Sequence, residues 1–257
     1  MTTGPLFGNR ERAESFGRIA AAYDRARPSY PPALVHALLM SDPSNVLDVG
    51  CGTGKAARLF AERDVSVLGV EIDPDMAAVA RTHGIDVEVS GFEDWDDRGR
   101  RFDLLISAQA WHWVDPARGA VRAAQVLEPA GTIALFWNLD HLTDRDDEVM
   151  DAVYAREAPE LLKFRRSRTG GRNGREEIVD ALRTAGFHHV VEASFPWRRR
   201  YTRDEWLDLL PTYSDHHLLP DEQRARLLAG VGAAIDDLGG SITADYETVL
   251  VSGVAPG

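Results

Sequence analysis

The sequence has a single cysteine among its 257 residues, Cys51, so no disulfide can form within the chain. One lone thiol is in keeping with a reducing compartment such as the cytosol. The first residues, MTTGPLFGNRERAESFGR, lack the continuous apolar segment of a secretory signal. No stretch approaches the ~18 apolar residues of a membrane span. We therefore expect a soluble, cytoplasmic protein that does not bind a membrane.

A surplus of basic residues is also missing. The chain has 29 Lys and Arg against 41 Asp and Glu, which gives a formal net charge of −12. Because nucleic-acid binding usually leaves a basic footprint, no nucleic-acid partner is expected. The histidines and carboxylates show no ligand spacing such as H-x-x-x-H, so the sequence predicts no metal site. The hydrophobic share of 44% is enough for a sizeable core.

Strand-like and helix-like segments alternate through the first half of the chain. Apolar runs of strand length stand at 45–50, 66–72, 85–92, 101–109 and 131–138, and helical patterns separate them at 55–64, 74–84 and 116–127. Such alternation predicts an α/β fold, with a mostly parallel sheet covered by helices on both faces.

The alternation breaks after residue 138. We expect a helix near 146–163 and another over 176–187, then a strand over 188–197 and a final strand over 241–254. Thr202 and Glu205 have the spacing of a capping box and predict a helix start. Two late strands separated by helical insertions suggest an antiparallel pair, with a lid over one edge of the sheet. Phe16, Ile19, Ala20 and Tyr23 have helical spacing ahead of the first strand.

The segment LDVGCGTGK joins the first strand to a helix and carries Gly50, Gly52 and Gly54. Glycines allow a tight turn and a close approach to a ligand at the carboxyl end of a parallel strand. A P-loop would need glycine at Val49 and a hydroxyl residue at Ala56, and neither is present. The dinucleotide fingerprint G-x-G-x-x-G fails at Lys55. Glu71, which ends the next strand, can accept hydrogen bonds from both hydroxyls of a ribose. Nucleoside binding without a pyrophosphate is the remaining interpretation.

These segments resemble a known family. VLDVGCGTGK, VEID at 70–73, SGFEDW at 90–95 and FDLLISAQAWHWVD are strongly similar to class I S-adenosylmethionine-dependent methyltransferases. The resemblance covers roughly residues 15–138. FGRIAAAYDRARPSYP and AQAWHW are most similar to small-molecule methyltransferases of the trans-aconitate and ubiquinone/menaquinone type (the methyltransferase type 11 group). The family implies a Rossmann-like, seven-stranded sheet whose last strand is antiparallel.

The resemblance also implies a domain plan. Residues 1–257 would form one methyltransferase domain, with an N-terminal helical cap at 1–40 and a cofactor-binding core at 41–138. Insertions at 139–175 and 198–240 would form the substrate lid.

The resemblance assigns S-adenosyl-L-methionine as the cofactor and gives each matching position a role. The loop and the acid before it would frame the methionine part, Glu71 would hold the ribose, and two tyrosines would close over the site. Ile72 would pack on the adenine, which Phe92 and Glu93 would read, and Ser107 would lie beside the methionine amine. The residues implied in cofactor binding are Tyr23, Tyr30, Asp48, Gly50, Cys51, Gly52, Gly54, Glu71, Ile72, Phe92, Glu93 and Ser107.

His112, between two tryptophans just beyond the fourth strand, is the candidate catalytic residue. Histidine can take a proton near neutral pH, so it could act as a general base. A substrate anchor, a wall of the cofactor pocket and a structural histidine are the alternatives. A carboxylate acceptor is already ionised at pH 7 and would need no base. The candidates for contact with the acceptor are Trp111, His112, Trp113, Trp137 and Asn138.

Arginines cluster at 163–175 and at 197–203, both within the expected lid. They could attract an anionic substrate, or form a solvated face paired with nearby acids. We expect an enzyme that methylates a small molecule at oxygen, carbon or nitrogen. A protein that binds the cofactor without transfer and a nicotinamide-dependent oxidoreductase are the alternatives. Neither the acceptor nor the oligomeric state can be read from the sequence.

Overall fold

A computed structural model describes residues 19–168, 174–217 and 219–257. Seven strands form one sheet in the order β3-β2-β1-β4-β5-β7-β6. Only β7 runs antiparallel to its neighbours, β5 and β6. The predicted seven-stranded, mostly parallel sheet with an antiparallel last strand is confirmed. The strands are β1 Asn45–Val49, β2 Ser66–Glu71, β3 Asp86–Val89, β4 Phe102–Ala108, β5 Leu127–His141, β6 His188–Thr202 and β7 Ser241–Val254.

Helices cover both faces of the sheet. One face packs on α6 and α9, which contribute Val126 and Leu182 to a core shared with Leu135. The other packs on α3 and α4 through Leu34 and Phe60. These helices and their neighbours in the first half are α2 Ala20–Ala26, α3 Pro32–Leu39, α4 Ala57–Ala61, α5 Pro74–Thr82 and α6 Pro116–Val126, and α9 is Arg175–Thr184.

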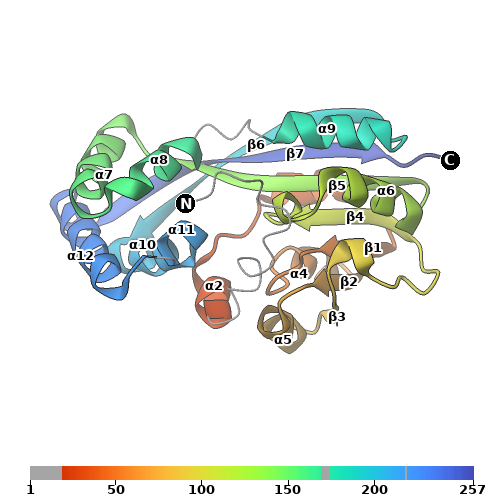
Figure 1. The fold of residues 1–257 in the computed structure, drawn as a ribbon, viewed down its shortest axis with the longest axis horizontal. Helices are drawn as coiled ribbons and strands as arrows, with labels where there is room; N and C mark the ends of the chain where they lie inside the picture. Colours follow the sequence, from red (N-terminus) through yellow and green to blue (C-terminus); the bar gives the residue numbers. More distant parts are fainter. Residues whose placement is uncertain (1–18, 169–173, 218) are drawn as a thin grey trace.

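Strands β5, β6 and β7 run well beyond the other four, and helices gather at their far end (Figure 1). There β5 continues to His141 and β6 to Thr202, so both strands extend into segments expected to belong to the lid. Alternate residues such as Tyr201, Ile242 and Tyr246 are buried beneath the helices, because side chains of a strand point to opposite faces in turn. The helices at this end are α7 Asp144–Glu157, α8 Pro159–Arg168, α10 Arg203–Leu209, α11 Ser214–His217 and α12 Asp221–Asp237.

The segment after β5 corrects one prediction. A single helix was expected near 146–163, but α7 ends at Glu157 and α8 begins at Pro159. Proline has no N–H to donate and disfavours the helical conformation of the residue before it, and Ala158 has φ −150° and ψ 64°. The capping box of Thr202 and Glu205 is present at the start of α10, as predicted.

The N-terminal segment is described from residue 19 on, so Phe16 and most of the predicted cap lie outside the described residues. In the part of the chain that the structure covers, no helix is long and apolar enough to cross a bilayer. The same residues include no group of three His, Cys, Asp or Glu side chains that could hold a metal ion.

Candidate active site

The glycine loop turns sharply between β1 and α4. Gly50, Gly52 and Gly54 have φ values of 66°, 54° and 77°, in the left-handed region that favours glycine. A Cβ atom at Gly50 would lie 2.5 Å from the Cβ of Ala110, so the loop can approach β4 only without a side chain there. The amides of Gly50 and Cys51 both donate to the carbonyl of Val70, at 2.8 and 3.2 Å. The loop therefore wraps the carboxyl end of β2.

Glu71 ties this loop to the turn after β2. Its Oε2 accepts the Gly52 amide at 2.7 Å, and its Oε1 accepts the Asp73 amide at 2.9 Å. The side chain is buried, and burial raises its pKa above the ordinary value. Each carboxylate oxygen has two lone pairs, so one on each remains for a ligand hydroxyl.

Asp48 lies beneath the loop with no hydrogen bond to either carboxylate oxygen among the described residues. The backbone amide of Ala57 favours the charged form of Asp48, but it makes no hydrogen bond of normal geometry with the carboxylate. Burial, together with repulsion from Glu71, raises the pKa of Asp48 to about 8. A buried carboxyl without a donor is costly to ionise, and a cation placed beside it would relieve that cost.

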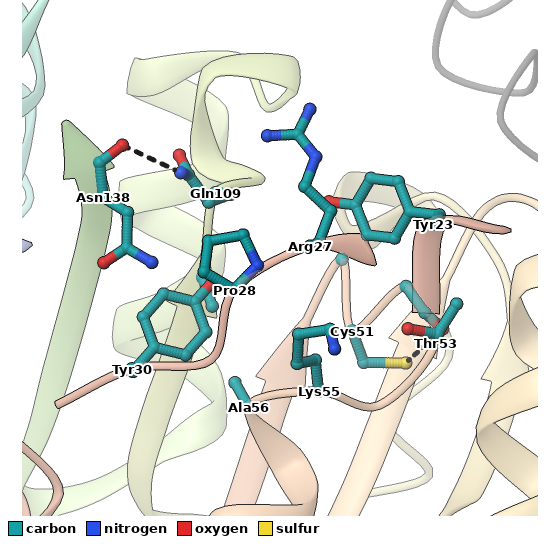
Figure 2. A pocket seen from close by; sticks show the side chains of 13 residues that line it. Tyr23, Arg27, Pro28, Tyr30, Cys51, Thr53, Lys55, Ala56, Gln109 and Asn138 are labelled. Atoms are coloured by element: carbon teal, nitrogen blue, oxygen red, sulfur yellow. Dashed lines mark hydrogen bonds between the residues drawn. The ribbon is translucent and has the colours of Figure 1, made fainter. Parts of the chain in front are cut away.

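A small cavity opens between the loop, the ends of β4 and β5, and the segment after α2. In Figure 2, Tyr30 lies on the same side as Gln109 and Asn138, and Tyr23 lies on the other side, beyond Arg27 and Pro28. The lining residues are Tyr23, Arg27, Pro28, Tyr30, Gly50, Cys51, Gly52, Thr53, Lys55, Ala56, Ala108, Gln109 and Asn138.

Asn138 is held in place at this cavity by three neighbouring segments. Its Nδ2 donates to the carbonyl of Ser29 at 3.0 Å, and its Oδ1 accepts the Thr248 hydroxyl at 2.6 Å. Gln109 donates to its carbonyl oxygen at 3.1 Å. Of the five predicted acceptor contacts, Asn138 is the one that lines the cavity.

The two candidate tryptophans that point elsewhere are Trp111 and Trp137. Trp111 is 1% exposed and lies in the core, with its ring 5.8 Å from that of Phe92. Trp137 packs against the same core cluster, while Phe136 and Asn138 face the opposite side of β5. Trp111 is enclosed in the core and Trp137 is partly buried against it, so contact of either side chain with the acceptor stays a prediction.

His112 and Trp113 lie in a short 3-10 helix, Trp111–Trp113, that follows β4. Both are half-buried, and their rings are 4.9 Å apart. Neither is among the residues that line the cavity. A catalytic or substrate-binding role for them stays a prediction.

The residues expected to bind adenine come together beside β2 and β3. The Ile72 side chain lies next to the turn at Gly91. A Cβ atom added at Gly91 would be 3.8 Å from the Cδ1 of Ile72. Phe92 and Glu93 follow in a 3-10 helix, Phe92–Asp94. The Phe92 side chain is buried in the core, and Glu93 accepts the Asp115 amide at 3.0 Å. The Phe92 side chain is turned into the core, whereas Glu93 is half-buried, so a role for Glu93 and for the backbone of this turn in adenine binding stays a prediction.

Ser107 serves the sheet itself. It is fully buried, and its hydroxyl donates to the carbonyl of Val49 at 2.8 Å, which links β4 to β1. The next two residues, Ala108 and Gln109, line the cavity instead. Gln109 has φ 57°, a strained value for a residue with a side chain.

Arg27, Pro28 and Thr53 line the cavity without having been predicted to do so. The expected cap already included the segment RARPSYP, but no periodic pattern shows which of its side chains turn inward. Lys55 also lines the cavity, and its Nζ donates to the carbonyl of Asp24 at 2.7 Å.

The arginine clusters are largely paired with acids. Arg165 forms ion pairs with Asp147 and with Asp151, the latter at 2.8 Å. Arg198 pairs with Asp245 at 2.5 Å, and Arg203 with Asp204 at 2.9 Å. Residues 169–173 of the first cluster lie outside the described residues. The described members therefore favour the interpretation of a solvated, ion-paired face.

Comparison with known proteins agrees with this geometry. Residues 46–131 match the family described as methyltransferase domain. An uncharacterized methyltransferase of Mycobacterium bovis is 33% identical over 229 residues, which cover 85% of this chain and 84% of that protein. A solved methyltransferase structure from Anaeromyxobacter dehalogenans superimposes with a TM-score of 0.63 at 24% identity, over 90% of this chain and 99% of the other.

The chain belongs to the class I S-adenosylmethionine-dependent methyltransferases, and S-adenosyl-L-methionine is its cofactor. The closer likeness to the trans-aconitate type is weak. A trans-aconitate 2-methyltransferase of Mycobacterium ulcerans is 33% identical over 120 residues, which cover 46% of this chain and 44% of that protein.

The glycine loop and the two buried carboxyl groups behind it fit this cofactor, although neither carboxyl group is among the residues that line the cavity. The buried, unpaired carboxyl of Asp48 suits the methionine ammonium, and the glycine loop leaves its backbone open to a ligand. Glu71, with a free lone pair on each oxygen, suits the ribose hydroxyls.

Proposed function

We propose that this enzyme transfers a methyl group from S-adenosyl-L-methionine to a small-molecule acceptor. The observation that carries the proposal is the cavity itself. It is bounded by the glycine loop, by Asn138 at the end of β5, and by the segment of Tyr23 and Tyr30. A site partly covered by its own N-terminal segment suits a small acceptor better than an extended polymer.

The cofactor supplies a methyl group activated by its positive sulfur. The acceptor atom forms a bond to the methyl carbon as the carbon–sulfur bond breaks, and the electron pair of that bond stays on sulfur as a neutral thioether. Little covalent chemistry is left for the protein, so its main contribution is to position the reactants and exclude water.

The chain's own residues have separate parts in this proposal. Asp48 and the loop backbone hold the methionine end, and Glu71 holds the ribose. Tyr30, whose ring meets Phe136 edge-on at 4.8 Å, closes the site from above the sheet. A hydroxyl or protonated amine acceptor requires a base, for which His112 is the candidate, whereas a carboxylate acceptor requires none.

A transfer assay tests the proposal. The purified enzyme is incubated with cofactor carrying an isotopically labelled methyl group and with a metabolite extract from which macromolecules have been removed. We expect mass spectrometry to find the label in a small molecule. Label found only in added protein or nucleic acid would contradict the small-molecule acceptor. Cofactor binding without transfer to any acceptor would favour the alternative of a silent binding protein.

A further inference from the structure

Asn138 is held by a chain of hydrogen bonds that begins on β6. The indole Nε1 of Trp197 donates to the Thr248 hydroxyl at 2.8 Å, and that hydroxyl donates to the Oδ1 of Asn138 at 2.6 Å. The Nδ2 of Asn138 then donates to the carbonyl of Ser29 at 3.0 Å. The chain of bonds therefore crosses β6, β7 and β5 and ends at the segment between α2 and α3.

The first member of this chain fixes its direction. An indole N–H can only donate, so the Thr248 hydroxyl accepts from Trp197 and gives its single proton to Asn138. The atom of Asn138 that faces Thr248 is therefore the oxygen, and the NH₂ group lies on the other side. In Figure 2 this nitrogen is turned toward Pro28 and Tyr30, which also line the cavity.

The residues around this amide have little freedom to move. Thr248 is fully buried, and Asn138 is 8% exposed. The Trp197 ring stacks on the Tyr246 ring, with the centroids 4.3 Å apart and the planes at 12°. Gln109, whose backbone is strained, donates to the Asn138 carbonyl oxygen. Strain of this kind persists where the surroundings over-determine it, and it gathers at functional sites.

The NH₂ group of Asn138 has one hydrogen to spare. The bond to Ser29 uses one of its two hydrogens, and the second has no acceptor among the residues that the structure describes. A nearly buried N–H without a partner is costly, and a ligand group with a free lone pair would satisfy it. Because Asn138 lines the cavity, such a ligand can reach it there.

The order of the strands separates the acceptor from the cofactor. The loops expected to bind the cofactor follow β1, β2 and β3, and they carry the glycine loop, Glu71 and residues 90–95. These three strands lie on one side of β4 in the sheet, and β5, β7 and β6 lie on the other. Ligands of such sheets bind beyond the carboxyl ends of the strands. A cofactor over β1 to β3 therefore leaves the end of β5, with Asn138, to the acceptor.

We propose that the second N–H of Asn138 donates a hydrogen bond to the methyl acceptor, and that Thr248 and Trp197 are positioning residues that orient this amide. This inference rests on the proposed function. The acceptor atom that takes the bond carries a free lone pair, as a hydroxyl, carbonyl or carboxylate oxygen does, and is not an ammonium nitrogen. A fixed donor here aligns the acceptor with the methyl group, so it contributes to transfer rather than to cofactor binding.

The test compares Asn138→Ala and Asn138→Asp with Thr248→Val, Thr248→Ser and Trp197→Phe. Valine keeps the shape of threonine without its hydroxyl, serine keeps the hydroxyl, and phenylalanine removes the indole N–H. The matched control is Thr243→Val, a half-exposed threonine on the opposite face of β7. Labelled cofactor and a dilution series of the macromolecule-free metabolite extract give the rate of transfer for each enzyme. Calorimetry gives the Kd of S-adenosylhomocysteine.

We expect the rate at saturating extract to fall about 30- to 100-fold in both Asn138 variants, about tenfold in Thr248→Val and about threefold in Trp197→Phe. Thr248→Ser should rescue most of the rate, and Thr243→Val should stay within about twofold of the unmodified enzyme. The Kd of S-adenosylhomocysteine should change less than about threefold throughout. A role for Thr248 in packing alone predicts the opposite order, because valine keeps the buried methyl group and serine loses it.

Other results would overturn the inference. An unchanged rate in Thr248→Val would remove the positioning role, and a loss of S-adenosylhomocysteine affinity equal to the loss in transfer would assign the hydrogen-bond chain to the cofactor. Transfer by Asn138→Asp at or above the unmodified rate would point to an ammonium acceptor. If an Asn138 variant does not fold, as denaturation would show, the order of valine and serine at Thr248 still decides. If the unmodified enzyme labelled no small molecule, the proposed function itself would fail, which distinguishes that outcome from the others.

Discussion

The two ends of the sheet are held together by different forces. At the glycine loop, backbone amides converge on buried carboxyl groups, as the bonds from Gly52 and Asp73 to Glu71 show. At the far end, aromatic and aliphatic side chains of α7, α10 and α12 pack on the extended strands around Tyr201 and Tyr246. The first end depends on charge and hydrogen bonding, and the second on buried apolar surface.

This difference indicates a division of labour. A site built of amides and carboxyl groups can recognise one fixed ligand, because hydrogen bonds are directional. A lid built of apolar packing tolerates changes of shape and sequence provided that volume is kept. We therefore expect substitutions at one end to leave the property of the other end largely unchanged.

The largest effect is expected for Leu227→Ala in α12. Leu227 is fully buried in the lid cluster, and removing such a side chain from a core costs about 2–5 kcal/mol. Chemical denaturation should show this loss, while the cofactor Kd of the folded protein changes less than about threefold. The control is Glu222→Gln, an exposed change on the same helix. A large loss of cofactor affinity in Leu227→Ala would show that the two ends are coupled.

Next in size is Glu71→Gln. The glutamine amide keeps the shape of the side chain, but only its oxygen can accept a hydrogen bond. Its NH₂ group would therefore face the backbone N–H of Gly52 or of Asp73, donor to donor. The loss of charge-assisted bonds should weaken cofactor binding by about 30- to 100-fold. Calorimetry measures this directly, with Glu88→Gln on the neighbouring strand as control. Unaltered affinity in Glu71→Gln would remove Glu71 from the binding site.

Asp48 predicts a dependence on pH. Its pKa of about 8 in the free protein means that it is mostly protonated at pH 7. A cofactor ammonium beside it would lower that pKa, so binding at pH 7 should release close to one proton, and affinity should rise up to about tenfold from pH 7 to 9. Calorimetry in two buffers of different ionisation enthalpy counts the proton. Proton release that persists in Asp48→Asn would assign it to another group.

The raised pKa of Asp48 also predicts how the stability of the protein depends on pH. Its pKa is raised in the folded state, so ionisation is disfavoured by folding and the free energy of unfolding should fall as pH rises from about 4 towards 8. Asp48→Asn should flatten this slope. Asp48→Asn should also weaken cofactor binding at pH 8. Together the two results would show that the Asp48 carboxyl contributes to binding while it lowers the stability of the folded protein.

The glycine loop could be predicted in detail because its information is local. Three glycines at fixed spacing predict a tight loop after the first strand, and their positive φ values agree with it, while the nucleoside contacts of the loop and of Glu71 stay a prediction. The alternation of strands and helices likewise predicted the sheet, because parallel strands need crossover helices.

Side-chain direction near the cavity could not be read in the same way. Trp111 and His112 are adjacent, yet one fills the core and the other lies half-buried outside the cavity lining. Arg27 enters the cavity because Thr212 and Tyr213, far along the chain, lie against it. Such contacts depend on the lid's long-range packing, which no short pattern encodes.

The smallest expected effect concerns the junction between the two ends. The Asp24 carboxylate on α2 accepts a hydrogen bond from the Arg58 guanidinium at 2.7 Å, and its other oxygen lies 2.9 Å from the His83 Nε2. These contacts link the cap to α4 and to the end of α5. Burial alone would raise the pKa of Asp24, but Thr53, Arg58 and His83 outweigh it and hold that pKa below the ordinary value. The stabilisation is therefore present above about pH 4 and is lost as pH falls through the lowered pKa.

Asp24→Asn should weaken cofactor binding about two- to fivefold at low salt and less at high salt, because screening already reduces such pairs. Calorimetry at two salt concentrations measures this, with Asp42→Asn as a surface control. An equal loss at both salt concentrations would mean that Asp24 acts through packing, and the cap would then belong with the apolar end of the molecule.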